Sequence, residues 1–213
     1  PECYASLFEQ QMNFFMQGMT YEIEFVPVDT TQQKVVYEDH SVTVETVPLR
    51  HRVPCCGYIF REKPTLPHIR RDMIDYYGIP LSQINNIKNG ADWTTPEGDI
   101  VPNSRLVEPA DAPRSYAYCS DTCYLPDLYE RVKDVTVLYH ESTYTSENED
   151  RAKIYYHSTA RQAALVAQKA GAGRLLLGHY SARYNNENVL LEEAKAVFPE
   201  SYLAQEGMVF EVK

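Results

Sequence analysis

Residues 135–140 read VTVLYH and residues 174–179 read RLLLGH, so two short apolar segments each run directly into a histidine. The same pattern recurs at residues 115–121, SYAYCSD, which end on an aspartate, and at Ser41–Leu49, which a histidine follows two residues later. In open α/β folds, ligands bind outside the carboxyl ends of the strands. We therefore expect four polar side chains to converge on one site, although they lie far apart in the sequence.

The side chains at these strand ends favour a metal site. Two of the histidines together with Asp121 offer neutral nitrogen and anionic oxygen, which suit zinc or a similar divalent ion. Asp121 follows its strand between hydroxyl residues, so its two oxygens could bridge two cations, or it could instead cap the following helix. The pattern as a whole predicts a metallohydrolase.

The composition is that of a soluble globular chain. Its 213 residues can form one large domain, with 44% apolar and 23% charged residues. No apolar run approaches the roughly 18 residues needed to cross a membrane. The net charge of −10 argues against a nucleic-acid partner, because phosphate favours a basic surface, but it is compatible with a local basic patch.

The five cysteines form no disulfide-like framework. Cys3 stands alone, Cys55 and Cys56 are adjacent, and Cys119 and Cys123 are spaced unlike the cysteines of zinc ribbons or thioredoxin motifs. We expect buried or half-buried thiols in a reducing cytoplasm, in preference to a metal or redox role.

The first part of the chain predicts a helix and then a meander of strands joined by polar turns. The helix is expected at Leu7–Met19. The strands are expected at Tyr21–Val28, Gln33–Glu38, Ser41–Leu49 and Gly57–Phe60.

Glu62–Pro113 differs from the rest of the chain. It holds more than half of the 13 prolines and no long periodic apolar stretch. A long segment of this kind is uncommon in a compact domain and is usually functional. We predict a protruding inserted arm with some structure of its own, including a helical turn at Met73–Tyr77 and turns at residues 78–80 and 88–90. A surface loop without function is the plainer alternative.

After Pro113, strands and helices alternate. The expected strands are Ser115–Cys119, Val135–Tyr139 and Arg174–Gly178, and the expected helices are Leu125–Val132, Ser158–Ala170 and Val189–Val197. Two short strands, Ser201–Gln205 and Met208–Val212, are expected to close the chain. Antiparallel strands followed by strand–helix alternation predict an α/β (α+β) fold in which helices cover a sheet.

Further polar residues accompany the strand ends. Glu141 follows His140 and is suited to orient an imidazole, although both could be solvated loop residues. His157 precedes the alanine-rich helix, whose first N–H groups favour an anion such as phosphate. A protonated His157 could donate to a leaving oxygen; a surface histidine beside a helix cap is the plainer interpretation.

Residues 179–184, HYSARY, form the densest polar cluster of the chain. The cluster joins His179 to the hydroxyl of Ser181 and to the forked guanidinium of Arg183, which suits phosphate. The arginines on either side of His51 could also face phosphate.

Five motifs together carry a resemblance that runs over nearly the whole chain: HRVPCCGY at 51–58, CSDT at 119–122, HEST at 140–143, HST at 157–159 and HYSARY at 179–184. They resemble the C-terminal motifs of ribonuclease Z, the tRNA 3′-processing endonuclease of the metallo-β-lactamase superfamily. Residues 78–80, GIP, and 87–90, IKNG, resemble the family's exosite, the arm that grips the tRNA elbow.

The resemblance implies a metallo-β-lactamase-like αββα sandwich with two zinc ions, or manganese or another divalent ion in their place. His51 would ligate one ion, His179 the other, and Asp121 would bridge them. His157 would assist at the scissile phosphate or the leaving group, with Glu141 holding it in place.

The resemblance also implies how substrate is bound. Arg183 and Ser181, together with Lys88 in the arm, are the expected contacts with precursor tRNA, and His140 is a supporting residue. Family members are homodimers in which the arm of one subunit serves the substrate in the active site of the other.

The superfamily's main metal signature, His-x-His-x-Asp-His, does not occur in this chain. The resemblance implies that this signature supplies most of the ligands and the general base. Three ligands cannot hold two zinc ions in closed geometry with a poised water. We therefore predict that residues 1–213 are the C-terminal part of a single metallo-β-lactamase-like domain, incomplete at its N-terminus, and that they supply only part of the metal site.

Two other functions remain open. One is another metallo-β-lactamase-fold phosphodiesterase or sulfatase, which would not need the arm at Glu62–Pro113. The other is a non-catalytic dimerisation or RNA-binding fragment, which the absent signature favours for the isolated chain.

Overall fold

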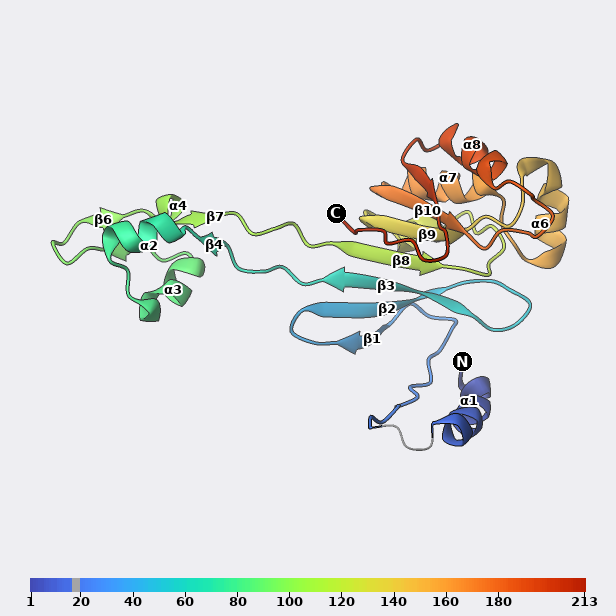
Figure 1. Cartoon of the computed structure of the whole chain (residues 1–213), viewed down its shortest axis with the longest axis horizontal. Helices are drawn as coiled ribbons and strands as arrows, with labels where there is room; N and C mark the ends of the chain where they lie inside the picture. Colours follow the sequence, from blue (N-terminus) through green and yellow to red (C-terminus); the bar gives the residue numbers. More distant parts are fainter. Residues whose placement is uncertain (17–19) are drawn as a thin grey trace. The chain divides into compact units, whose positions relative to one another are not determined.

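The computed structural model describes residues 1–16 and 20–213. Contacts divide the chain into two compact units, drawn in Figure 1. Unit 1 comprises Pro1–Arg61 and Arg114–Lys213, and unit 2 comprises Glu62–Pro113. Each unit is described by itself.

Unit 1 is built on a seven-stranded sheet of order β1-β2-β3-β8-β9-β10-β11. β1 pairs with β2 and β3 pairs with β8 in antiparallel fashion, whereas β8, β9, β10 and β11 are parallel neighbours. The expected α/β class is confirmed, and the carboxyl ends of β8, β9 and β10 meet at one edge. The strands are β1 (Val35–Glu38), β2 (Val42–Pro48), β3 (Cys56–Glu62), β8 (Ser115–Cys119), β9 (Val137–Glu141), β10 (Arg174–Gly178) and β11 (Ser201–Leu203).

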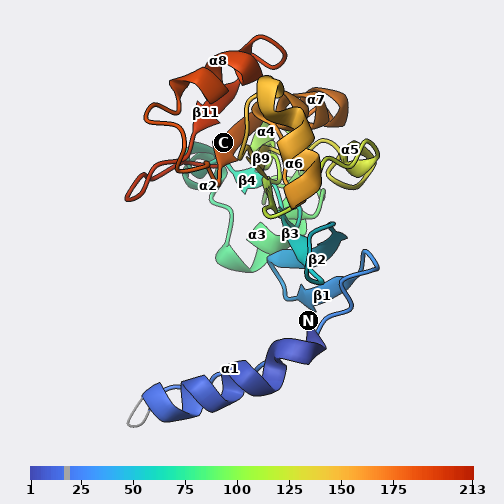
Figure 2. The same ribbon diagram turned by 90° about the vertical axis from the view of Figure 1, so that its right-hand side faces the viewer.

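Helices gather over the parallel half of this sheet, as Figure 2 shows. The helix α7 packs against β9 and β10 and lies beside two other helices, α5 and α8. The helices of unit 1 are α1 (Glu2–Phe15), α5 (Leu128–Arg131), α6 (Glu149–Tyr155), α7 (Ala160–Ala170) and α8 (Asn188–Lys195), and a 3-10 turn covers Ser146–Asn148.

The sequence of α7 explains both its start and its close packing. The side chain of Thr159 accepts the N–H of Gln162, whose own side chain accepts the N–H of Thr159, and the helix ends at Gly171 with a φ of 66°. Its inward-facing residues are alanines, which are short enough for the helix to lie close on the sheet. These alanines, at 160, 163, 164, 167 and 170, are buried in the same core as Leu138, Leu175 and Leu177.

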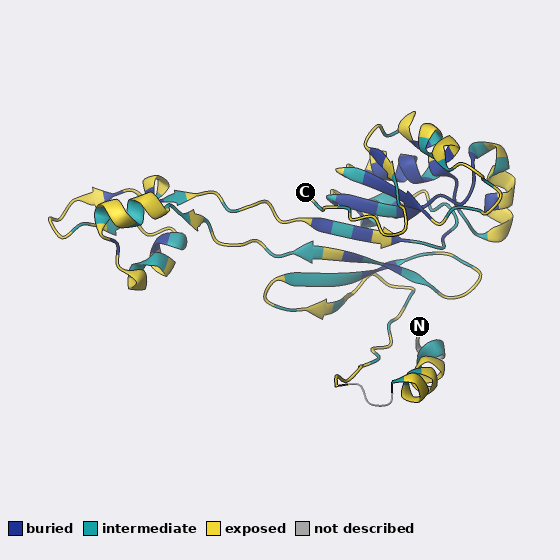
Figure 3. Ribbon diagram, viewed as in Figure 1, coloured by how far each residue is buried: buried dark blue, intermediate teal, exposed yellow. Residues whose placement is uncertain are grey.

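The opposite face of the sheet carries a row of aromatic side chains. The strand registers align Tyr58, Tyr118, Tyr139, Leu176 and Tyr202 across β3, β8, β9, β10 and β11. The rings of Tyr118 and Tyr139 stack with their centroids 4.6 Å apart. This aromatic row is only partly covered, because Tyr118 is 41% exposed and Tyr202 is 36% exposed. Figure 3 shows that burial in unit 1 is concentrated in β8–β10 and their helices.

Unit 2 has a small hydrophobic cluster of its own, formed by Ile79, Ile87, Val101 and Leu106. The side chain of Asn103 donates to the carbonyl oxygen of Ile87 at 2.6 Å and ties two of its helices together. The elements are α2 (Arg71–Tyr77), α3 (Leu81–Lys88), α4 (Asn103–Leu106) and the antiparallel pairs β4 (His68–Ile69) with β7 (Val107–Glu108) and β5 (Trp93–Thr94) with β6 (Ile100–Val101).

Two expected strands are wrong. Tyr21–Val28 contains no strand, and Val26 is 61% exposed, because no strand in the described residues pairs with this segment. Met208–Val212 is not a strand either. The Arg174 guanidinium donates to the carbonyl oxygens of Glu211 and Lys213 at 2.8 and 2.9 Å, so side-chain contacts replace a strand ladder.

The helix expected at Leu7–Met19 is present as α1, which starts and ends earlier, and residues 17–19 lie outside the described residues. The turn expected at Met73–Tyr77 is the helix α2, ended by Gly78 with a φ of 58°. The helices α3 and α6 are not expected from the sequence. None of the helices in the described part of the chain has the length and apolar character that crossing a bilayer requires.

Candidate metal centre

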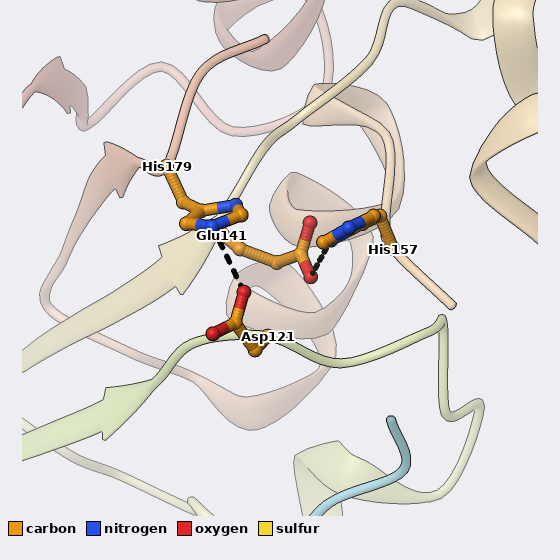
Figure 4. Close-up of side chains that lie close together, drawn as sticks. All are labelled: Asp121, Glu141, His157 and His179. Atoms are coloured by element: carbon orange, nitrogen blue, oxygen red, sulfur yellow. Dashed lines mark hydrogen bonds and ion pairs between the residues drawn. The ribbon is translucent and has the colours of Figure 1, made fainter. Parts of the chain in front are cut away.

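The strand ends of β8, β9 and β10 bring polar side chains together. Asp121 follows β8, Glu141 is the last residue of β9, and His179 follows β10 directly. His157 joins them from the turn between α6 and α7. One nitrogen or oxygen atom from each of the four lies within 4.8 Å of the others. Figure 4 shows the four side chains close together.

The backbone at this site is strained. Asp121, His179 and Tyr156 adopt left-handed conformations, with φ values of 55°, 57° and 60°. Such a conformation costs a non-glycine residue on the order of 1–3 kcal/mol and persists only where its surroundings enforce it. Asp121 caps no helix, since the next one, α5, begins at Leu128. The alternative role as an N-cap is therefore wrong.

His179 and Asp121 face the same point. Nε2 of His179 lies 2.9 Å from Oδ1 of Asp121, and both side chains are nearly half exposed. Nδ1 of His179 lies 2.9 Å from Oγ1 of Thr143. When Nδ1–H is donated to Thr143, the lone pair of Nε2 points towards the carboxylate, so a nitrogen and an oxygen are presented together to a divalent cation.

Glu141 is fully buried, and its carboxylate accepts four hydrogen bonds. The donors are the Thr122 N–H at 2.7 Å, the His157 ring at 3.0 Å, the Thr143 hydroxyl at 2.6 Å and the Ser158 N–H at 3.0 Å. Burial by itself raises the pKa of Glu141, but the hydrogen bonds from His157, Ser158 and Thr143 and the charge of His157 outweigh burial and hold the pKa below its ordinary value. Because its acceptor positions are filled, Glu141 is suited to orient His157 and not to bind a metal.

His157 lies between two other histidines. Its ring centroid is 5.1 Å from that of His51 and 5.2 Å from that of His179. The hydrogen bond to Glu141 raises the pKa of His157, the negative charges of Glu141 and Asp121 raise it further, and these effects outweigh burial. His157 is therefore suited to hold a proton near Asp121 and His179.

His51 adjoins the four-residue group without belonging to it. Its Nδ1 lies 3.0 Å from the carbonyl oxygen of Tyr156, and donation of Nδ1–H there leaves Nε2 available as a ligand. The loop of His51 is tied to the loop after β8, because Arg50 N–H donates to the Thr122 hydroxyl and Cys123 N–H donates to the Arg50 carbonyl oxygen. The role of His51 as a metal ligand stays a prediction.

The expected substrate-binding residues lie in two places. Arg183 and Ser181 belong to the loop that carries His179; Arg183 donates to the Asn148 side chain at 3.1 Å and lies over the Tyr144 ring at 5.3 Å. Lys88 is the last residue of α3 in unit 2.

His140 is a core residue. It is fully buried, its Nδ1 lies 2.7 Å from the carbonyl oxygen of Glu141, and burial lowers its pKa. The carboxylate of Glu141 pairs with His157 and not with the adjacent His140. Because both His140 and Glu141 are fully buried, the idea that they are solvated loop residues is wrong.

The expected character of the thiols is confirmed for the four described cysteine side chains, which are all free. Cys119 is buried, and Cys55, Cys56 and Cys123 are half-buried. The side chain of Cys3 lies outside the described part of the chain.

Thr122, Thr143 and Ser158 are functional positions that sequence reasoning did not assign. Each makes a hydrogen bond to Glu141. In the sequence, each of the three is a hydroxyl residue that lies within two positions of a proposed site residue. That signal is common, and only the fold shows which hydroxyl residues face the carboxylate.

No family model matches the chain. Among curated proteins, it is 49% identical over 208 residues to a protein named ribonuclease Z from Bacteroides fragilis, covering 98% of this chain and 68% of the relative. It is 47% identical over 214 residues to ribonuclease Z from Phocaeicola vulgatus, covering 99% of this chain and 69% of the relative. The chain therefore spans about two thirds of the length of these relatives.

Two solved structures share the fold at low sequence identity. The metallo-β-lactamase fold protein YhfI from Bacillus subtilis superposes with a TM-score of 0.58 at 16% identity, over 97% of this chain and 62% of that one. The short form of human tRNase Z superposes with a TM-score of 0.58 at 18% identity, over 98% of this chain and 64% of that one. These likenesses show a metallo-β-lactamase fold, and the curated relatives show that the chain belongs to the ribonuclease Z family.

Proposed function

We propose that this chain carries part of the active site of a metal-dependent endoribonuclease that removes 3′ trailers from precursor tRNA. The observation that carries the proposal is the convergence of Asp121, His179, His157 and Glu141 within 4.8 Å at the carboxyl end of the sheet. The name of the curated relatives, ribonuclease Z, supports RNA as the substrate class.

The residues of the site fit a divalent ion. His179 offers a nitrogen and Asp121 an oxygen to one point, and the second oxygen of Asp121 is available for a second ion, which His51 would share. Zinc suits these nitrogen and carboxylate donors, and manganese is the alternative. When bound, two such ions acidify water towards a pKa of about 7 and stabilise the charge that builds on phosphate.

His157 and Glu141 supply proton chemistry. Glu141 fixes the His157 ring through Nδ1, which leaves Nε2 to face the scissile phosphate. Protonated His157 then donates to the oxygen that leaves, in the role of a general acid. Arg183 and Ser181, on the same loop as His179, hold the RNA end, with the planar guanidinium on a phosphate.

The metal site needs ligands from outside these 213 residues. Asp121, His179 and His51 leave two ions incompletely coordinated. The partly exposed aromatic row of the sheet further supports a sandwich whose second layer is not part of this chain. We propose that a segment with the His-x-His-x-Asp-His signature supplies both, and we call a protein with both parts the extended polypeptide.

Unit 2 is proposed to be the arm that grips the body of the tRNA, with Lys88 as one contact. Its own hydrophobic cluster supports an independent binding module. We further propose a cytoplasmic homodimer in which each arm serves the other subunit's site.

The test is cleavage of a 3′-extended precursor tRNA by the extended polypeptide with zinc. We expect wild type to release the trailer, and Asp121→Ala to abolish release while leaving tRNA binding near normal. Asp150→Ala, an exposed change at the start of α6, is the matched control. Trailer release by Asp121→Ala at the wild-type rate would overturn the proposal.

A further inference from the structure

A cavity of about 530 Å³ opens beside His157. Its wall includes Arg50 from the His51 loop, Tyr124 from the loop after β8, Lys153 from α6, and Tyr156. In the described part of the chain, His157 lines this cavity, whereas the other three members of the four-residue group do not. The volume lies in the range of small-ligand pockets, about 300–1,000 Å³.

We propose that this cavity binds the nucleotide that carries the leaving oxygen. Arg50 and Lys153 hold the next phosphate of that nucleotide, and Tyr124 packs against its base. The inference rests on the proposed function and deepens it, because it states where the RNA strand lies on one side of the scissile bond.

The charges of the wall suit a phosphate. The Arg50 guanidinium lies over the Tyr156 ring, 5.9 Å from its centroid, which holds a cation at the cavity. Lys153 adds a second cation on an exposed helix face. Glu149 also lines the cavity, but its carboxylate already accepts the Gln162 side-chain amide at 3.1 Å. A phosphate therefore meets more positive than negative charge, as strand binding requires.

The aromatic side chain in the wall suits a base. Tyr124 is half-buried and packs against the main core, so it offers a fixed ring edge or face to a nucleotide. Contacts between bases and aromatic rings are sequence-tolerant, because every base has a π-face. A subsite of this kind accepts different nucleotides at the cleavage point.

His157 links the cavity to the reaction. In an in-line displacement, the entering and leaving oxygens lie on opposite sides of phosphorus. Figure 4 shows Asp121 and His179 to one side of His157, so water enters there. The bond from the water oxygen to phosphorus forms, the water loses a proton to solvent, the bond to the leaving oxygen breaks, and that oxygen takes the proton of His157. The leaving nucleoside then lies away from Asp121 and His179, and the cavity beside His157 is lined by neither of them.

The experiment tests whether one side chain, that of Lys153, contacts one phosphate of the substrate. It uses the extended polypeptide with zinc. The substrate is a 3′-extended precursor tRNA with a single neutral methylphosphonate at the linkage beside the scissile one. The product that ends in a hydroxyl carried the leaving oxygen, so its identity shows on which side of the scissile bond the leaving oxygen lies. Lys153→Ala, Lys153→Arg and the exposed control Arg151→Ala are compared with wild type on natural and neutral linkages.

We expect the neutral linkage to lower kcat/KM of wild type by more than about tenfold, because it removes the charge that both Arg50 and Lys153 contact. Lys153→Ala should lose about tenfold on the natural substrate, and the neutral linkage should then cost it several-fold less than it costs wild type, because the Lys153 contact is already absent and only that of Arg50 remains. Lys153→Arg should restore most of the loss. A neutral linkage on the other side of the scissile bond should affect wild type and Lys153→Ala equally.

Two results would overturn the inference while wild type still cleaves the tRNA: an equal penalty for the neutral linkage in wild type and Lys153→Ala, or equal rates for Lys153→Ala and Arg151→Ala. If wild type does not cleave precursor tRNA at all, the proposed function fails first and the inference fails with it.

Discussion

Glu141 is the residue on which the proposed chemistry depends most closely. Its buried carboxylate receives four hydrogen bonds and fixes the ring of His157. In Glu141→Gln, the side-chain NH₂ would face a backbone donor at either oxygen position, the Thr122 N–H at one or the Ser158 N–H at the other, and His157 would lose its charged partner. We expect a loss of about 10²- to 10⁴-fold in single-turnover cleavage of precursor tRNA, the range for a misplaced general acid.

The matched control for that prediction is Glu147→Gln, an exposed carboxylate in the 3-10 turn before α6. It should cleave at the wild-type rate. If Glu141→Gln did so as well, the orienting role of Glu141 would be wrong.

The thiols give a second prediction at the scale of single residues. Burial raises the pKa of Cys119 to about 12 and that of Cys55 to about 11. Only the thiolate reacts with iodoacetamide, so both should resist alkylation at pH 8, and Cys55 should react faster as the pH rises towards 11. Peptide mass spectrometry measures this. Labelling of Cys119 in the folded protein as fast as in urea would contradict its placement in the core.

At this scale, the sequence identified the reactive side chains, and the family resemblance paired Glu141 with His157, but the residues alone did not indicate the hydroxyl and backbone partners of Glu141. His157, Asp121 and His179 are recognisable because each follows or precedes a clear element. The pairing of Glu141 with His157 spans 16 positions and depends on the turn at Tyr156, whose left-handed backbone no local pattern indicates.

Among the elements, α7 begins at a cap two residues after His157. Thr159→Ala removes the hydroxyl that accepts the Gln162 N–H, so we expect the free energy of unfolding to fall by about 1 kcal/mol. Thr159→Ser keeps the hydroxyl and should recover most of that loss. Urea unfolding of the extended polypeptide followed by circular dichroism measures both variants, and equal stability of Thr159→Ala and wild type would contradict the capping role.

The parallel strands and α7 could be predicted because periodic apolar residues mark them clearly. β8 and β10 have the expected bounds. The failures have a common cause. Tyr21–Val28 and Met208–Val212 alternate like strands, but pairing depends on a neighbour that the sequence of the segment does not specify. The helices α3 and α6 are short and polar, so their few apolar residues do not show a clear helical periodicity.

At the scale of the whole molecule, unit 2 is proposed to serve binding and unit 1 to serve chemistry. Arg61 pairs with Ser115 in the β3–β8 ladder, so replacing residues 62–114 with a two-residue Asn-Gly turn would close a hairpin in the same register. We expect this replacement to weaken binding of precursor tRNA by at least about tenfold and to spare turnover of bis(p-nitrophenyl) phosphate, because avidity from a second contact is lost.

Filter binding and a colorimetric assay on the extended polypeptide measure the two effects of the replacement. If the replacement removed small-substrate turnover as well, unit 2 would be a structural part of the catalytic unit and its role as a tRNA-binding arm would be wrong.

The central claim is that His51, Asp121 and His179 are one part of a metal site that other residues complete. The most direct measurement is cleavage of a 3′-extended precursor tRNA, with zinc, by the 213-residue chain and by the extended polypeptide in parallel. We predict trailer release by the extended polypeptide and none by the 213-residue chain. Release by the 213-residue chain alone would contradict the claim, because these residues would then form a working site without the His-x-His-x-Asp-His signature.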